Sequence, residues 1–189
     1  MKKLAALVLF LLSALLLAAC SSSDDNGAGS ASTGEDTHNA ADVTFATGMI
    51  PHHEQAVEMA DMALQMTQDP QITELAQQIK DAQQPEIDTL TEWLTAWGEP
   101  LPDASSMGDH SGMSGMMSAE DMAMLEQSSG TEFDKMWLQM MIEHHKGAVE
   151  MAQTQQADGK YPQALEMSKQ IIASQQEEID QMQELLSAL

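Results

Sequence analysis

Two stretches of the chain each place a methionine three residues before a pair of histidines. They read MIPHHEQAVEMA, from Met49, and MIEHHKGAVEMA, from Met141. Residues three or four apart share one face of an α-helix, so each methionine would lie beside its histidines. Imidazole nitrogen and thioether sulfur together suit copper, and thioethers favour Cu(I). The spacing therefore predicts two metal-binding clusters with these members: Met49, His52, His53, Met59, Met141, His144, His145 and Met151.

The two motifs belong to a longer internal repeat. A shift of 92 positions aligns residues 45–94 with residues 137–186 without a gap, and 21 of the 50 aligned pairs are identical. The chain therefore contains one structural unit written twice.

Each unit is predicted to form two helices joined by a short turn. Apolar residues recur three and four positions apart in both halves of the unit, and strand-type alternation is absent. Asp69 and Pro70 are typical of a helix start, and Gly98 of a helix end. Two amphipathic hairpins bury their apolar stripes most simply against each other. We expect an all-α, antiparallel four-helix bundle over residues 42–189, with hairpins at 42–98 and 130–189 and a joining segment at 99–129.

A helical wheel assigns different depths to the members of each cluster. Met49 and His53 face the core, as do Met141 and His145, whereas His52, Met59, His144 and Met151 fall at the rim. In the second helix of each unit, Glu86 and Glu178 lie on the apolar stripe. A carboxylate facing a core is costly unless it has a partner. An inward histidine or a metal ion would supply one, so both a ligand set and a plain His–Glu pair fit this pattern.

The joining segment contains a second group of possible ligands in a glycine- and serine-rich stretch. Its thioethers suit Cu(I) outside the cell, where thiolates would be oxidised. The alternative is a methionine-rich loop that covers the bundle. The candidate residues are Met107, His110, Met113, Met116 and Met117.

The N-terminus has the pattern of a secretory signal. Lys2 and Lys3 precede an apolar run that ends in Leu-Ala-Ala before Cys20, and this run is too short for a typical membrane span. It looks like a lipoprotein signal over residues 1–20, in which Cys20 becomes the acylated N-terminus; an uncleaved anchor helix is the alternative. Residues 21–41 are small and polar and are expected to form a disordered tether.

The composition favours cations over nucleic acid as binding partners. Thirty acidic residues against seven basic ones give a formal net charge of −23, which disfavours nucleic acid and attracts cations. Seventeen methionines against one cysteine leave thioethers as the sulfur ligands of the mature domain.

The sequences GMIPHHEQAVEMA and SGMMSAEDMAMLEQSSGTEFDKMWLQMMIEHHKGAVEMA, together with the lipoprotein signal, resemble the family called domain of unknown function 305. That family includes secreted CopM-like copper-binding proteins, and the resemblance covers about residues 42–188. It implies a ferritin-like four-helix bundle and copper binding in the cell envelope. The motif residues carried over by position are Met49, His52, His53, Met141, His144 and His145.

The leading hypothesis is a non-enzymatic lipoprotein that captures or buffers copper at the cell envelope, as Cu(I) or also as Cu(II). Its expected partners are metal ions, the membrane through the lipid anchor, and other copper-handling envelope proteins. One alternative is a copper- or iron-dependent oxidase on the same bundle. Another is a metal-free structural or partner-binding bundle, in which the histidines only pair with Glu86 and Glu178.

Overall fold

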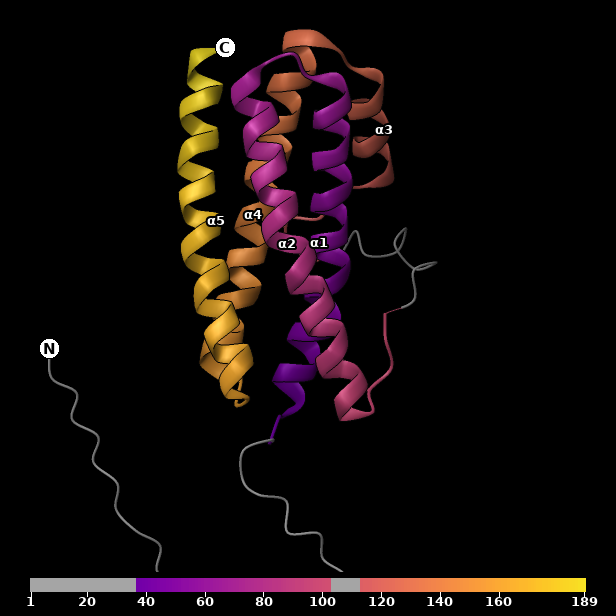
Figure 1. Cartoon of the computed structure of the whole chain (residues 1–189), viewed down its shortest axis with the longest axis vertical. Coiled ribbons are helices and arrows are strands. Elements are labelled where there is room, and N and C mark those ends of the chain that lie inside the picture. The colour runs from indigo at the N-terminus through magenta and orange to yellow at the C-terminus, as the bar shows by residue number, and fades with distance from the viewer. Residues whose placement is uncertain (1–36, 103–112) are drawn as a thin grey trace, which may run out of the picture. The chain divides into compact units, whose positions relative to one another are not determined.

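The computed structural model describes residues 37–102 and 113–189, and it contains no strand within these ranges. Four long helices and one short helix account for nearly all of them (Figure 1). The predicted all-α bundle of two helical hairpins is thereby confirmed. The helices are α1 (Ala40–Met66), α2 (Pro70–Trp97), α3 (Ala119–Gln127), α4 (Gly130–Asp158) and α5 (Pro162–Ala188).

The two hairpins meet mainly through their first helices. Helix α1 packs along α2, and α4 packs along α5, within each repeat. Between the repeats, α1 packs on α4, whereas α2 and α5 touch only briefly. The helices that carry the paired histidines therefore form the interface between the two halves.

The local sequence accounts for the helix ends. Asn39 caps α1 by accepting hydrogen bonds from the backbone N–H groups of Ala41 and Asp42, while the Asp42 carboxylate accepts from the Asn39 N–H at 2.7 Å. Because of this reciprocal cap, α1 begins at Ala40, inside the segment expected to be a tether. Helix α2 begins at Pro70 behind the Asp69 cap, as predicted, and ends at Gly98 with φ 75°.

Asp42 also ties the start of α1 to the turn between α4 and α5. Its carboxylate is fully buried and accepts hydrogen bonds from the Gln155 side chain and from the backbone N–H groups of Lys160 and Tyr161. Burial raises the pKa of the Asp42 carboxyl group, and the hydrogen bonds from Gln155 and the three backbone donors more than offset it, so this pKa lies below its ordinary value.

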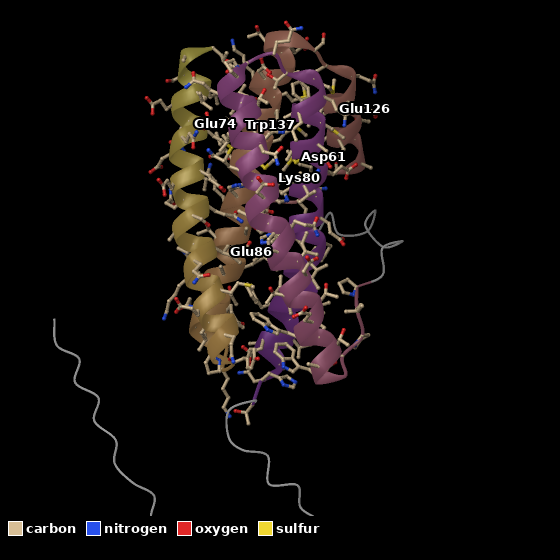
Figure 2. All side chains as sticks on the ribbon, viewed as in Figure 1. Asp61, Glu74, Lys80, Glu86, Glu126 and Trp137 are labelled. Carbon is tan, nitrogen blue, oxygen red and sulfur yellow. The ribbon has the colours of Figure 1, made fainter. Side chains whose placement is uncertain are left out.

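The apolar core consists of two clusters at different levels of the bundle. One contains Trp137, whose indole N–H donates to the Met59 carbonyl at 2.8 Å, and it extends under α3 through Leu125. The other contains Phe45 and Tyr161. Figure 2 shows Trp137 at the level of the first cluster and Glu86 at a different level along the bundle. On α1 and α4, the paired histidines fall in the sequence between the residues of the two clusters.

Within the part of the chain that the structure describes, no helix is both long and apolar enough to cross a lipid bilayer. The predicted signal, its Cys20 and most of the predicted tether lie outside the described residues.

Candidate metal site

All four paired histidines are buried at the interface between the repeats. His52 and His53 of α1 and His144 and His145 of α4 each have 0% of their surface exposed, and we call these four residues the histidine layer. The helical wheel placed His52 and His144 at the rim, which is wrong. The rim of each hairpin is the surface that packs on the other hairpin, so it becomes the middle of the bundle.

The centre of the histidine layer is the contact between His52 and His144. Their ring centroids lie 3.9 Å apart at an interplanar angle of 44°. The Nε2 atom of His52 donates to the Ser114 carbonyl at 3.2 Å, which leaves Nδ1 as the nitrogen with a free lone pair. Neither ring nitrogen of His144 makes a hydrogen bond of normal geometry among the described residues, although a backbone group of His52 lies near the ring.

The burial of this pair keeps both rings neutral. Burial, reinforced by the neighbouring His53, lowers the pKa of His52 to about 3. Burial together with the nearby His52 and His145 holds the pKa of His144 well below its ordinary value. A neutral imidazole is the form of histidine that can bind a metal ion, and both rings are in that form.

The outer histidines are each bonded to the glutamate that the sequence placed on the apolar stripe. His53 Nε2 lies 2.8 Å from Glu86 Oε2, and His145 Nε2 lies 2.8 Å from Glu178 Oε2. Both carboxylates are half-buried, with 21% and 16% of their side chains exposed. A carboxylate that accepts from one ring nitrogen orients the other nitrogen for ligation. The Nδ1 atoms of His53 and His145 have no partner within the described ranges.

Two buried glutamines lie near the histidine–glutamate pairs on α2 and α5. Gln83 and Gln175 lie one turn before Glu86 and Glu178 on α2 and α5, and each is 2% exposed. Both amide atoms of Gln83, and the Oε1 atom of Gln175, lack a hydrogen-bond partner in the described structure. The repeat signalled these residues, because Gln-x-x-Glu-Ile occurs at the same place in both units.

Three of the four methionines in the two motifs are fully buried, and the fourth is partly exposed. Met49 and Met141 are fully buried on the helices that carry the histidines. Met59, expected at the rim, is also fully buried, and it belongs to the apolar cluster around Trp137. Met151 is partly exposed near Gly48: a Cβ built at Gly48 would lie 3.0 Å from the Met151 methyl carbon and 3.8 Å from the Met113 sulfur.

Residues 113–117 lie across the histidine layer, and we call them the cover segment. Besides its carbonyl contact to His52, Ser114 donates from Oγ to Glu150 at 2.6 Å. The Gln55 side chain exchanges two hydrogen bonds with the Met117 backbone, at 2.9 and 2.8 Å. The described part of the joining segment is therefore packed on the bundle, with Met113, Met116 and Met117 partly buried. Met107 and His110 lie outside the described residues.

A glycine on α4 allows this close approach. A Cβ built at Gly147 would lie 2.0 Å from the Ser114 carbonyl oxygen and 2.8 Å from the Gly115 Cα. The repeat aligns Gly147 with Gln55, so the two copies differ at the positions where the cover segment is held. Sequence reasoning missed the role of both residues, although their difference between otherwise matching motifs was a usable signal.

The nitrogen and oxygen ligands do not form a metal site by themselves. Among residues 37–102 and 113–189, no three His, Cys, Asp or Glu side chains are grouped as a metal-binding set. A metal site in the histidine layer therefore needs the methionine sulfurs, or a small movement of the rings, in addition to the imidazoles.

The fold and this site define a class of duplicated helical hairpins with paired histidines buried between the repeats. Residues 42–186 match the family model of DUF305, a domain of unknown function, and the chain belongs to this family. No match to a curated protein was found.

Solved structures agree with this assignment. A DUF305 protein from Streptomyces coelicolor is 31% identical, with a TM-score of 0.72 over 78% of this chain and 93% of that chain. A DUF305 fragment from Deinococcus radiodurans is 30% identical, with a TM-score of 0.73 over 80% and 98%. CopM in its Cu(I)-bound form is 31% identical, with a TM-score of 0.67 over 78% and 96%. CopM is also known in Cu(II)-bound and silver-bound forms.

Proposed function

We propose that this protein binds copper in the histidine layer and captures or buffers the metal outside the cytoplasm. One observation carries the proposal: a fully buried, neutral His144 makes no hydrogen bond of normal geometry among the described residues and lies against a second buried histidine. Leaving a buried polar group unsatisfied costs about 1–3 kcal/mol. A bound metal ion would remove the part of that cost that comes from the free ring lone pair of each histidine.

The available donors favour copper. Met49 and Met141, three residues before His52 and His144 on the same helices, are fully buried in the two apolar clusters. Thioethers favour Cu(I), whereas imidazole with a nearby carboxylate also suits Cu(II). The similarity to CopM, which has been solved with Cu(I) and with Cu(II), supports the same choice.

The residues divide into donors and residues that orient donors. We assign the metal to the imidazole nitrogens of the histidine layer, with Met49 and Met141 as thioether donors. Glu86 and Glu178 fix the tautomer and orientation of His53 and His145 rather than binding the metal themselves. Met59 is assigned to core packing. A second group of donors would capture copper before it reaches the layer: Met151, Met107, His110, Met113, Met116 and Met117.

The N-terminal sequence and the relatives support a location outside the cytoplasm. The apolar run that ends before Cys20 supports export and acylation at that cysteine. The similarity to CopM and to the Streptomyces coelicolor protein is consistent with a role outside the cytoplasm. We therefore propose a membrane-anchored lipoprotein of the cell envelope that exchanges copper with other envelope proteins.

The direct test is a Cu(I) titration of the purified chain against a competing chelator, in a Cys20→Ser background that removes its one thiol. Replacing His52 and His144 by leucine is expected to weaken Cu(I) binding about 100-fold or more. Loss of a residue that only orients a metal ligand already costs up to about 100-fold in affinity, and loss of two ligands should cost at least as much. His38→Ala is the matched control, because His38 stacks on Trp97 away from the layer. Unchanged affinity in the double variant would overturn the proposal.

Thermal unfolding separates copper binding from the metal-free alternative. A ligand that binds only the folded state raises the unfolding temperature, by an amount that grows with ligand concentration. Copper is expected to raise it for the unaltered layer and not for the double variant. If copper leaves the unfolding temperature of both proteins unchanged, a structural or partner-binding bundle is favoured.

A further inference from the structure

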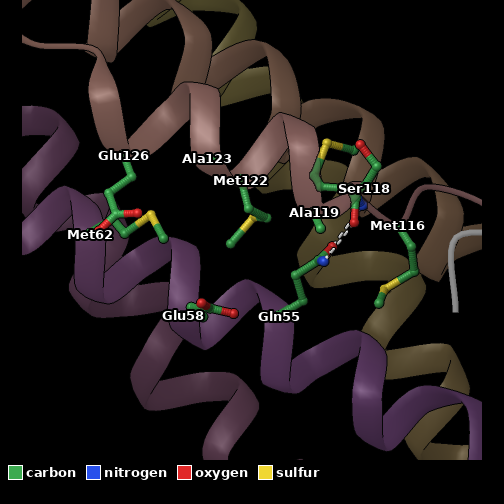
Figure 3. Close-up of a pocket in the computed structure, with 10 residues that line it drawn as sticks. Gln55, Glu58, Met62, Met116, Ser118, Ala119, Met122, Ala123 and Glu126 are labelled. Carbon is green, nitrogen blue, oxygen red and sulfur yellow. Dashed lines mark hydrogen bonds between the residues drawn. The ribbon is translucent and has the colours of Figure 1, made fainter. Parts of the chain in front are cut away.

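A methionine-lined pocket lies between α1 and α3, apart from the histidine layer. It has a volume of about 320 Å³ and is lined by four methionines: Met62 of α1, Met122 of α3, and Met116 and Met117 at the C-terminal end of the cover segment. Figure 3 shows Met62 and Met122 reaching into this space from opposite sides, with Met116 near its other end. Methionine side chains from three separate parts of the chain therefore line one solvent-connected pocket.

The pocket is held open by contacts that do not involve these sulfurs. Leu125, fully buried, anchors α3 on the core, and the Ser118–Asp121 capping box fixes the start of that helix. Gln55 fixes the Met117 backbone with two hydrogen bonds. Because the methionines are only partly buried, they line a space that they do not fill.

The electrostatics of the pocket favour a cation. Glu58 and Glu126 are exposed carboxylates of its lining, and no lysine belongs to that lining. Figure 3 shows the Glu58 carboxylate beneath Met122, and Glu126 beside Met62. Thioethers select soft metals, and a nearby carboxylate attracts and neutralises the positive charge.

We propose that this pocket is a second metal site, which takes a soft monovalent cation, Cu(I) or Ag(I), on the sulfurs of Met62, Met122, Met116 and Met117. The pocket lies next to the histidine layer along the bundle. Gln55, which borders the pocket, lies one turn beyond His52, and the segment that it holds also covers His52 through Ser114. The inference deepens the proposed copper role, but the pocket and the histidine layer can each be removed without the other.

Silver is the probe, because Ag(I) is soft, monovalent and not reduced or oxidised during the measurement. The purified full chain, with Cys20→Ser and ¹³C-labelled methionine methyl groups, is titrated with Ag(I). The test variant carries Met62→Leu and Met122→Leu, which nearly conserve side-chain volume and are expected to leave the fold intact. The matched control carries Met66→Leu and Met124→Leu, one residue on each of the same helices and neither in the pocket lining.

We expect the test variant to bind one equivalent of Ag(I) fewer than the control, with the Met116 and Met117 methyl signals no longer shifting on titration. Equal stoichiometry and equal methyl shifts in the test variant and the control would overturn the pocket site. A parallel His52→Leu and His144→Leu protein should still lose binding at the layer and keep the Met62 and Met122 shifts. If that protein binds as much metal as the parent while the methionine variant loses an equivalent, the layer proposal fails and the pocket stands.

Discussion

The rings of His52 and His144 lie 3.9 Å apart between centroids, although 92 positions separate the two residues in the sequence. That separation equals the repeat length, so each histidine meets its own counterpart across the interface between the two hairpins. Neither hairpin can form this contact alone. The central feature of the candidate site is therefore a product of the duplication.

Removing the unpartnered histidine should stabilise the metal-free protein. His144→Leu deletes two buried nitrogens that make no hydrogen bond of normal geometry among the described residues, and the free energy of unfolding is expected to rise by about 1 kcal/mol. Chemical denaturation in the presence of a chelator measures it. His145→Leu is the comparison, because it leaves Glu178 without its bonded histidine and should lower stability. A destabilised His144→Leu protein would mean that its nitrogens are satisfied in the metal-free state.

The glutamates should matter for copper through the histidines that they orient. Glu178→Gln removes the charge that holds His145 Nε2, and we expect Cu(I) affinity to fall about 10- to 100-fold. Glu177→Gln, one residue earlier on α5 and exposed, should leave the affinity unchanged. Chelator competition on both variants gives the comparison. Equal affinities would show that the His–Glu pair serves only the fold.

The Asp42 carboxylate should make stability depend on pH at the acid end. Its folded-state pKa lies below the ordinary value of 3.8, so its stabilising effect is fully present above that value. The effect is lost as the pH falls through the lower, folded-state pKa. Asp42→Asn should cost about 1–3 kcal/mol at neutral pH, and the difference from the parent should shrink on acidification.

Denaturation curves from neutral to strongly acid pH test this dependence. The exposed Asp158, near the same end of the bundle, provides the control through Asp158→Asn, which should follow the parent at every pH. A deficit in the Asp42→Asn protein that stays constant down to the most acid pH would contradict the assignment to the ionised carboxylate.

A methyl group at position 147 should dislodge the cover segment. Gly147→Ala would place a Cβ 2.0 Å from the Ser114 carbonyl oxygen, which is backbone and must move. The hydrogen bond from His52 to that oxygen should be lost, and hydrogen exchange of the cover segment and of the His52 ring should increase. Mass spectrometry of both regions measures this change. Ala148→Gly, at the adjacent buried position, should leave the cover segment's exchange unchanged, and equal protection in the Gly147→Ala protein would contradict the packing described.

Much of the architecture was predictable because it depends on local and periodic signals. The repeat, the Asp69–Pro70 helix start and the Gly98 helix end all correspond to observed elements. Pairing of the inward glutamates with histidines was also within reach, since a buried carboxylate needs a partner. These features depend on a few neighbouring residues or on one helix face.

The depth of His52 and His144 could not be read from a single helix. A wheel ranks positions within one hairpin, whereas the burial of these two rings depends on how the second hairpin packs. The cover segment was unpredictable for a related reason. Its contacts to His52, Gln55 and Gly147 join residues that are far apart in the chain and follow no period.

The cover segment belongs to the connection between the repeats and to neither repeat itself. A lone hairpin paired with an identical copy would have the same histidine contact on its twofold axis, but no strap across it. Fusion of the two copies thus supplied the segment that shields this axis on one side. It also allowed equivalent positions of the two repeats to differ: Gln55 binds the cover segment, and Gly147 leaves room for it.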